Sequence, residues 1–266
     1  NPLVQPIAVV KTYLSRTNFN SSRLVRLLAD FNAGERGDAR AESRGKPSFA
    51  ERLGQWLDLN HAIALSGALH PSLRQGPGGT AAGAADQVAA LVARAQAALR
   101  DAITQGGGGK ARIKLSVPEA GATLESGGKY LPYRRYYLAQ QREMEAALVQ
   151  LRAQVREALK GGSPSLRQLA GLDGVLEKAL AERERNLFLN VPLLLEKRFE
   201  QLRDAYASAL EASSQADGVA RWMQPGGWLA VFCKDLQSVL LAELEIRLQP
   251  VLGLVEAFGN EVSKSQ

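Results

Sequence analysis

Two arginines and four tyrosines lie within nine residues of this sequence, in the stretch YLPYRRYYL at 130–138. A guanidinium group binds phosphate oxygens through a planar fork of N–H donors, and a tyrosine ring can stack on an exposed nucleic-acid base. Pro132 suits the first turn of a helix, so Arg134 and Arg135 would follow a helix N-terminus, whose free N–H groups also favour anions. With Arg142 two turns below Arg135, the stretch is a candidate phosphate-binding surface.

The tyrosines have a second interpretation. Tyr130, Tyr133 and Tyr137 share one face of the expected helix, and packing in a core is the commoner use of such rings. The sequence leaves both interpretations open: a core face with arginines at the surface, or a surface for nucleic acid or another anion.

Two other stretches add cations to this candidate surface. KARIKLSV at 110–117 alternates cationic with mostly apolar residues, the period of two that is typical of a strand. SSRLVRLLADF at 21–31 places two arginines beside a leucine stripe at helical spacing. The candidate nucleic-acid-binding residues are therefore Arg23, Arg26, Lys110, Arg112, Lys114, Arg134, Arg135 and Arg142.

Motifs for other chemistry are absent or incomplete. The two histidines, His61 and His70, have no Cys, His or carboxylate at metal-ligand spacing, so we expect no metal site and no cofactor. GGGGKA at 106–111 differs from a phosphate loop, because Thr104 stands where that motif needs Gly and Ala111 where it needs a hydroxyl. No catalytic residue can be assigned, and we expect a protein that is not an enzyme.

The single cysteine and the acidic residues have structural interpretations. Cys233 lies at helical spacing in WLAVFCKDL and is expected to be a buried hydrophobic residue. One cysteine excludes an internal disulfide, which suits a reducing cytoplasm. The carboxylates of ERER at 182–185 and ELEIR at 243–247 alternate with bases, a pattern typical of solvated helix faces with i to i+4 pairs.

Helical periodicity dominates the chain and predicts an all-α fold, a helical bundle with long antiparallel helices in its C-terminal half. Pro192 predicts a break near 188–191, QPGG at 224–227 predicts a turn, and Pro250 predicts a bend or interruption of the last helix. The expected helices cover 21–31, 47–71, 81–104, 133–159, a short stretch after 163, 175–212, and residues from Trp228 onward.

Two of these expected helices carry informative patterns. In 133–159, residues recur at 4-3-4-3 spacing, the pattern of a short coiled-coil seam. The seam is a candidate interface for a partner helix, formed by Met144, Leu148, Leu151 and Val155. In 47–71, Ser48 and Glu51 form a capping box. The apolar face of that helix comprises Phe49, Leu53, Trp56, Leu57 and Ile63 or Ala64.

A glycine-rich stretch interrupts the helical pattern in the middle of the chain. Residues 106–129 are predicted to be a basic arm or linker, either flexible or β-ribbon-like. The arm divides an N-terminal helical region at 1–105, which contains a charged loop at 32–47, from a long-helix region at 130–266.

The basic residues are unevenly distributed along the chain. Residues 1–50 carry 8 basic and 4 acidic groups and residues 110–160 carry 10 and 5, whereas the C-terminal third is slightly acidic. This asymmetry favours an anionic partner for one part of the chain and protein contacts for the other. No apolar run is long enough for a membrane span, and the N-terminal patch IAVV is too short for a signal peptide, so we expect no membrane insertion.

FNSSRLVRLLADF at 19–31 and SFAERLGQWLDLNHAIALSGAL at 48–69 resemble a proteobacterial family that is known as a domain of unknown function. The resemblance continues more loosely through YLPYRRYYLAQQREMEAALVQLR at 130–152 to the last helix. Members are encoded beside a stator-like membrane motor protein, a partner with a peptidoglycan-binding domain, and a second helical protein. That set resembles the type III Zorya antiphage defence system, in which this chain would be the F component and its helical neighbour the G component. The loop at 32–47 departs from the family pattern, because it is longer and richer in charge.

The resemblance implies a non-enzymatic cytoplasmic defence component that acts in complex with the helical G-type protein. Double-stranded phage DNA would be a further partner, bound through the basic surface, and the membrane motor would be a functional link. The alternative is a pure protein–protein interaction scaffold, in which the basic surface is incidental. Affinity for DNA that falls steeply with salt would distinguish the first function from the second.

Overall fold

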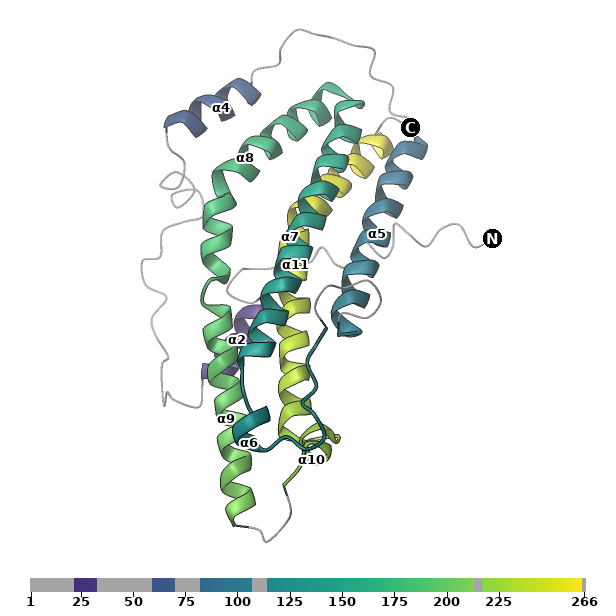
Figure 1. Ribbon diagram of the computed structural model, residues 1–266. Helices are drawn as coiled ribbons and strands as arrows, with labels where there is room; N and C mark the ends of the chain where they lie inside the picture. Colours follow the sequence, from purple (N-terminus) through teal and green to yellow (C-terminus); the bar gives the residue numbers. More distant parts are fainter. Residues whose placement is uncertain (1–21, 33–58, 70–81, 107–113, 213–216, 265–266) are drawn as a thin grey trace, which may run out of the picture.

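The computed structural model describes residues 22–32, 59–69, 82–106, 114–212 and 217–264. All regular structure in these residues is helical, which confirms the prediction of an all-α bundle (Figure 1). The helices are α2 (Arg23–Asn32), α4 (Leu59–Leu69), α5 (Ala82–Thr104), α6 (Leu124–Gly127), α7 (Leu131–Lys160), α8 (Pro164–Phe188), α9 (Val191–Glu211), α10 (Val219–Met223) and α11 (Trp228–Lys264). Residues 33–47 of the predicted loop and the capping box at 48–51 lie outside the described residues.

Four long elements run along the bundle in alternating directions: α5, then α7, then α8 with α9, then α11 (Figure 1). The contacts agree with these directions. Gln237 of α11 donates to the carbonyls of Ile103 and Thr104, and Arg100 lies 4.0 Å from Glu245, so α5 and α11 are antiparallel. α8 and α9 run antiparallel to both α7 and α11, which confirms the long antiparallel helices predicted for the C-terminal half.

Helix α7 begins where Pro132 predicts. Pro132 stands in its first turn, and the hydroxyl of Tyr130 donates to the carbonyl of Pro192 at 2.7 Å, which ties the start of α7 to α9. The helix continues to Lys160, and one of its faces is buried from end to end. The buried residues are Tyr133, Tyr136, Tyr137, Gln140, Met144, Leu148, Leu151, Val155 and Leu159.

Helices α8 and α9 together form a rod whose break is confirmed. The break falls between Phe188 and Val191, and Pro192 occupies the first turn of α9, where its missing N–H has no intrahelical partner to lose. The prediction of a short helix after residue 163 and a separate helix from 175 is wrong, since α8 is one continuous helix. Gly171 lies inside α8 under α4, where a Cβ would come within 3.8 Å of the Cβ of Ala68. A glycine by itself disfavours a helix, yet α8 continues through Gly171, at a position where α4 packs on it.

Helix α11 begins immediately after the predicted QPGG turn. Gly226 adopts a φ of +85°, a left-handed conformation that favours glycine. A Cβ at Gly227 would lie 2.3 Å from the carbonyl oxygen of Arg221, so the turn also requires glycine there. The helix continues through Pro250 without interruption to Lys264, and its last part leans toward α5 (Figure 1). Of the two outcomes predicted for Pro250, the bend is the one that occurs.

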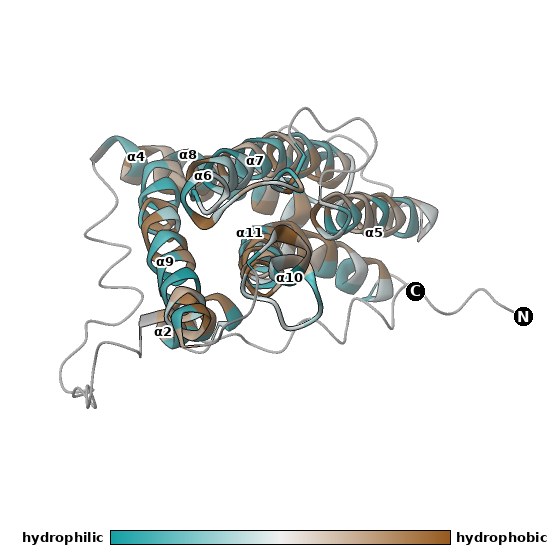
Figure 2. Cartoon of the chain, turned by 60° about the horizontal axis from the view of Figure 1, so that its bottom comes forward, coloured by the Kyte–Doolittle hydropathy of each residue, from teal (hydrophilic) through white to brown (hydrophobic). Residues whose placement is uncertain are grey.

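Helix α11 is the central element of the bundle. It packs against α2, α5, α7, α8, α9 and α10, and it is apolar over most of its length (Figure 2). An aromatic cluster fills the core between α7, α9 and α11. The ring centroid of Phe199 lies 4.9 Å from that of Phe232, 5.5 Å from Tyr133 and 5.2 Å from Trp228. Tilted and edge-on pairs of this kind add to the free energy of burying the rings.

The remaining described elements rest on this bundle. Helix α2 packs against α9 and α11, and α4 packs against α8. In the described part of the predicted arm, Leu115 packs on the core, and its N–H donates to the carbonyl of Gly106. Residues 114–123 form no strand, because a single strand-like stretch has no neighbour with which to pair. Helices from both sides of the arm contribute to one hydrophobic core.

Candidate functional site

The three candidate arginines of α7 lie on its exposed side. Arg134, Arg135 and Arg142 are exposed, and none forms an ion pair with another residue that the structure describes. Residues 131–142 contain these arginines and no acidic residue, whereas Glu143 and Glu145 follow directly, so the excess of positive charge belongs to the first turns of α7, where the helix dipole adds to it. Arg135 and Arg142 are seven residues apart, which places them on one side of the helix and about 10.5 Å apart along its axis. We call this set the α7 arginines.

The candidate cations of α2 lie elsewhere. Arg23 forms an ion pair with Glu245 of α11 at 3.3 Å, and Arg26 is exposed. In Figure 1, α2 lies behind α9 and to the side of α11, whereas α7 lies in front of α11. The structure therefore does not join the arginines of α2 and α7 into one surface. Lys114 is exposed at the start of the segment that leads to α6, whereas Lys110 and Arg112 lie outside the described residues.

The tyrosines of YLPYRRYYL belong to the core. Tyr130, Tyr133, Tyr136 and Tyr137 are buried, and burial is the largest cause that raises the pKa of each phenol, that of Tyr136 to about 12. Rings enclosed in this way cannot stack on a nucleic-acid base while α7 stays packed. For the tyrosines, the structure has the core face of the first interpretation. The arginines beside them are at the surface, where they stay a candidate for binding an anion.

The predicted partner seam is buried inside the chain itself. Met144, Leu148, Leu151 and Val155 all belong to the hydrophobic core, in which α7 packs against α5, α8 and α11. The four residues predicted as an interface for a partner helix are therefore covered by helices of the same chain. A 4-3 spacing shows that an apolar stripe must be covered, but it does not show whether the covering helix belongs to the same chain.

A buried carboxylate, Glu243, lies at the middle of α11. Its side chain is 0 % exposed. The hydroxyl of Tyr137 donates to Oε2 at 2.6 Å, while Nε2 of Gln141 and Nε of Arg247 donate to Oε1 at 2.9 Å and 2.8 Å. Both oxygens thus accept hydrogen bonds, which offset the cost of removing the charge from water.

Arg247 extends this arrangement to α8. Its side chain is 7 % exposed, its Nη1 lies 3.2 Å from Oε1 of Glu184, and its guanidinium carbon lies 4.2 Å from the ring centroid of Phe188. Burial and then the Glu243 carboxylate raise the pKa of Tyr137, because an ionised phenol would bring two negative charges together. We call Tyr137, Gln141, Glu184, Glu243 and Arg247 the Glu243 centre, and it links α7, α8 and α11.

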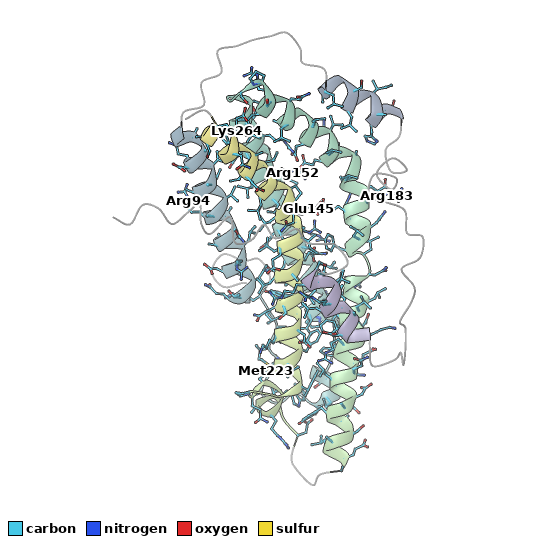
Figure 3. The ribbon with its side chains drawn as sticks, turned by 180° about the vertical axis from the view of Figure 1, so that it is seen from behind. Arg94, Glu145, Arg152, Arg183, Met223 and Lys264 are labelled. Carbon is cyan, nitrogen blue, oxygen red and sulfur yellow. The ribbon has the colours of Figure 1, made fainter. Side chains whose placement is uncertain are left out.

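A second ion-pair network lies further along α7. Nη2 of Arg152 is 2.6 Å from Oδ1 of Asp173, and Nη1 of Arg156 is 2.6 Å from Oε2 of Glu177. A shallow pocket of about 100 Å³ lies between α7, α8 and α11, and residues of both networks line it. Figure 3 shows two of the lining residues, Glu145 and Arg152. The described carboxylates of both networks are held in ion pairs with arginines, so this region stabilises the packing of three helices.

The described residues offer little for bond-making chemistry. No group of three or more His, Cys, Asp or Glu side chains within them is placed to hold a metal ion. Cys233 is buried, and burial raises its pKa to about 11, which confirms the prediction of a buried hydrophobic residue. Candidate interaction surfaces among the described residues are therefore those formed by exposed charged or apolar side chains.

The sequence patterns do not predict the Glu243 centre. ELEIR at 243–247 predicts a solvated face with i to i+4 pairing. The pair of Glu243 and Arg247 is confirmed, but the solvated face is wrong for it, because these two side chains are 0 % and 7 % exposed. An i to i+4 ion pair looks the same in sequence whether it faces water or the core. The signal that could have found it is the nearly continuous apolar run around it, since a helix that is hydrophobic on all sides is buried. ERER at 182–185 is closer to its prediction, because Arg183 and Arg185 are exposed.

The fold and these sites define an all-α bundle with a buried ion-pair centre and a cationic helix start. The family model described as Protein of unknown function (DUF3348) matches residues 10–260, and the chain belongs to this family. Searches of curated proteins and of solved structures found no match. Among the described helices, none combines the length and the apolar character that crossing a membrane requires.

Proposed function

We propose that this protein is a non-enzymatic, DNA-associated component of a bacterial antiphage defence system, which acts in the cytoplasm together with a helical partner protein. The observation that carries the DNA part is the set of α7 arginines, which are exposed and form no ion pair with a described residue. The resemblance of the motifs at 19–31, 48–69 and 130–152 to the F component of type III Zorya supports the defence role. The same resemblance supports the G-type partner and the link to a stator-like membrane motor.

Buried contacts hold the α7 arginines in place. Tyr130 is hydrogen-bonded to the carbonyl of Pro192 at 2.7 Å, and Tyr137 is hydrogen-bonded to Glu243 at 2.6 Å, so the first turns of α7 are fixed to α9 and α11. Arginines on a fixed helix lose less conformational freedom when they bind than arginines on a loose segment. The burial of the tyrosines therefore supports the phosphate-binding function of their neighbours.

The α7 arginines predict a particular kind of DNA binding. Contacts from guanidinium groups to phosphates carry no base information, so the binding is independent of sequence. Three contacts are few, and non-specific binding of this kind has a Kd on the order of 10⁻⁴ to 10⁻⁶ M at physiological salt. A partner that adds contacts would raise this affinity, which suits a protein that acts in a complex.

The test compares two variants of the full chain that each lose three cations. One is Arg134→Ala with Arg135→Ala and Arg142→Ala on α7. The matched control is Lys178→Ala with Arg183→Ala and Arg185→Ala, which removes three exposed cations from α8. Binding to a fluorescent DNA duplex is followed by anisotropy at low salt. We expect the α7 variant to lose at least about tenfold in affinity and the α8 variant less than about threefold.

Two results contradict the DNA part of the proposal. Equal losses in both variants would mean that only the net charge matters, and no binding by the wild type, alone or with the helical partner, would remove the premise. The interaction scaffold is the second candidate, favoured by the exposed apolar side chains of Leu131 and Val149 on α7. It is the better function if the complex survives nuclease treatment and the α7 variant protects cells from phage as well as the wild type does.

A further inference from the structure

Three leucines at the junction of α8 and α9 are strongly exposed. Leu187 is 68 % exposed, Leu189 is 65 % exposed and Leu193 is 55 % exposed. Single apolar side chains at a surface are ordinary, but three within seven residues are a concentration that calls for a cover. Leu189 and Leu193 are four residues apart, so they share one side of the rod, whereas Leu187, two residues before Leu189, lies on another side. We call Leu189 and Leu193 the leucine patch.

Two docked helices bracket the leucine patch along the rod. On α9, Nε2 of Gln201 donates to the carbonyl of Phe31 at the end of α2, and the guanidinium carbon of Arg198 lies 5.4 Å from the ring centroid of Phe31. On α8, Nε2 of Gln168 donates to the carbonyl of Leu69 at the end of α4, at 2.7 Å. Figure 1 shows α2 beside α9 and α4 beside α8. The leucine patch lies between these two attachment points.

Residues 33–58 connect these two helices in the chain, from the end of α2 to the start of α4. This segment leaves α2 at its Phe31 end, which is the end on the rod. The opposite end of α2 is attached to α11, where Arg23 pairs with Glu245 at 3.3 Å. The order along the chain, α2 then 33–58 then α4, therefore matches the order along the rod, α2 then the leucine patch then α4.

The segment is long enough to lie on the patch. The 33 residues of the rod between Gln168 and Gln201 correspond to about 50 Å of helix. A chain of 26 residues can reach about 86–94 Å when fully extended. The segment joins α4 at Leu59, and α4 itself leads to the attachment point at Leu69. Even with 12 residues of the segment in a helix about 18 Å long, the other 14 reach about 46 Å, so the patch is within range.

We propose that residues 47–58 dock on the leucine patch. This segment immediately precedes α4, and its sequence predicts an amphipathic helix that starts at the capping box of Ser48 and Glu51. Its apolar residues, Phe49, Leu53, Trp56 and Leu57, follow i, i+4, i+7 and i+8, which places them on one face. Docking joins an apolar face and an apolar patch that otherwise both meet water. The outer layer of the rod then consists of α2, residues 47–58 and α4 in chain order.

Cysteine cross-linking of the full chain tests the proposal. In a Cys233→Ala background, Leu53→Cys is combined with Leu189→Cys or with Leu193→Cys. The matched control pairs Leu53→Cys with Val149→Cys, which is 52 % exposed on α7. With a short thiol cross-linker at low protein concentration, we expect linked peptides within the monomer for at least one leucine pair and none for the control. Links found only between two chains would assign the patch to a second copy and overturn the proposal, as would no link at all.

Fluorescence gives a second test that does not depend on cross-linker geometry. Trp222 and Trp228 are buried, so the difference between the wild type and Trp56→Phe isolates the emission of Trp56. We expect Leu189→Asp with Leu193→Asp to shift that emission to the red without loss of helical circular dichroism, because both leucines lie outside the core. Val149→Asp is the control and should leave it unchanged. An unshifted Trp56 emission in the leucine variant would overturn the proposal, and neither result depends on DNA binding.

Discussion

Removal of the Glu243 carboxylate has a large effect that can be worked out from the structure. In Glu243→Ala, Arg247 loses the partner at 2.8 Å and keeps only Glu184, at 3.2 Å and 43 % exposed. The hydroxyl of Tyr137 and the amide of Gln141 each lose an acceptor. The variant therefore leaves one buried cation poorly paired and the Tyr137 hydroxyl without its acceptor, while Gln141 keeps its hydrogen bond to that hydroxyl at 2.9 Å.

The expected loss of stability follows from these contacts. Breaking a buried ion pair by removing one partner costs about 3–5 kcal/mol. Because Arg247 keeps its ion pair with Glu184, we expect a cost below the upper limit of this range. We expect Glu243→Ala to lower the free energy of unfolding by about 4 kcal/mol, or the Tm by about 8–16 °C for a chain of this size. Glu243→Gln keeps the shape and one acceptor oxygen, so its loss should be about half as large.

Equilibrium unfolding in urea, followed by far-UV circular dichroism, measures these differences. The control replaces the three central groups together by apolar residues of similar size, Glu243→Leu, Arg247→Met and Tyr137→Phe. It should fold with nearly wild-type stability, because no buried charge is left without a partner. A loss below about 1 kcal/mol for Glu243→Ala would refute this reasoning, as would a triple variant no more stable than the single one.

Two further predictions concern α7. The pKa is raised for the three buried tyrosines of α7 and for Tyr130 at its N-cap. The contribution of these phenols to stability is therefore complete below pH 10, the ordinary pKa of a phenol, and is lost as the pH rises through the folded value, about 12 for Tyr136. Each tyrosine then removes about 1.4 kcal/mol per pH unit, so an alkaline titration followed by circular dichroism should show cooperative unfolding above pH 10, and unchanged stability up to pH 12 would contradict it. For the seam, Leu151→Ala should cost about 2–5 kcal/mol in urea unfolding, against less than about 0.5 for Val149→Ala on the exposed side. A stable Leu151→Ala variant that fails only to bind a partner would return the seam to an intermolecular role.

Much of the fold follows from local rules that the sequence carries. Pro132 marks the start of α7, Pro192 marks the break of the rod, and the QPGG turn marks the start of α11. These signals are local, because proline restricts the backbone and glycine permits conformations that other residues avoid, whatever the rest of the fold. The spacing of Tyr130, Tyr133 and Tyr137 correctly predicts a shared buried face. These inferences need no knowledge of which elements meet in space.

The sites depend on contacts between distant residues, and there the sequence is less informative. Tyr137 and Glu243 are 106 positions apart and meet only because α7 and α11 pack side by side. The same packing covers Leu148 and Leu151, which a single sequence leaves available to either the same chain or a partner. The exposed arginines of α7 are predictable for a simpler reason, because they stand on the side of the helix opposite its apolar stripe.

The salt dependence of DNA binding decides whether the α7 arginines form a phosphate-binding surface. Each phosphate contact contributes about 0.9 to the slope of log K against log salt for duplex DNA, so three contacts contribute about 2.7. We predict that the α7 triple variant has a slope shallower than the wild type by about this amount, while the α8 control variant keeps the wild-type slope within about 0.5. Equal slopes for the wild type and the α7 variant would contradict the proposal that α7 binds DNA.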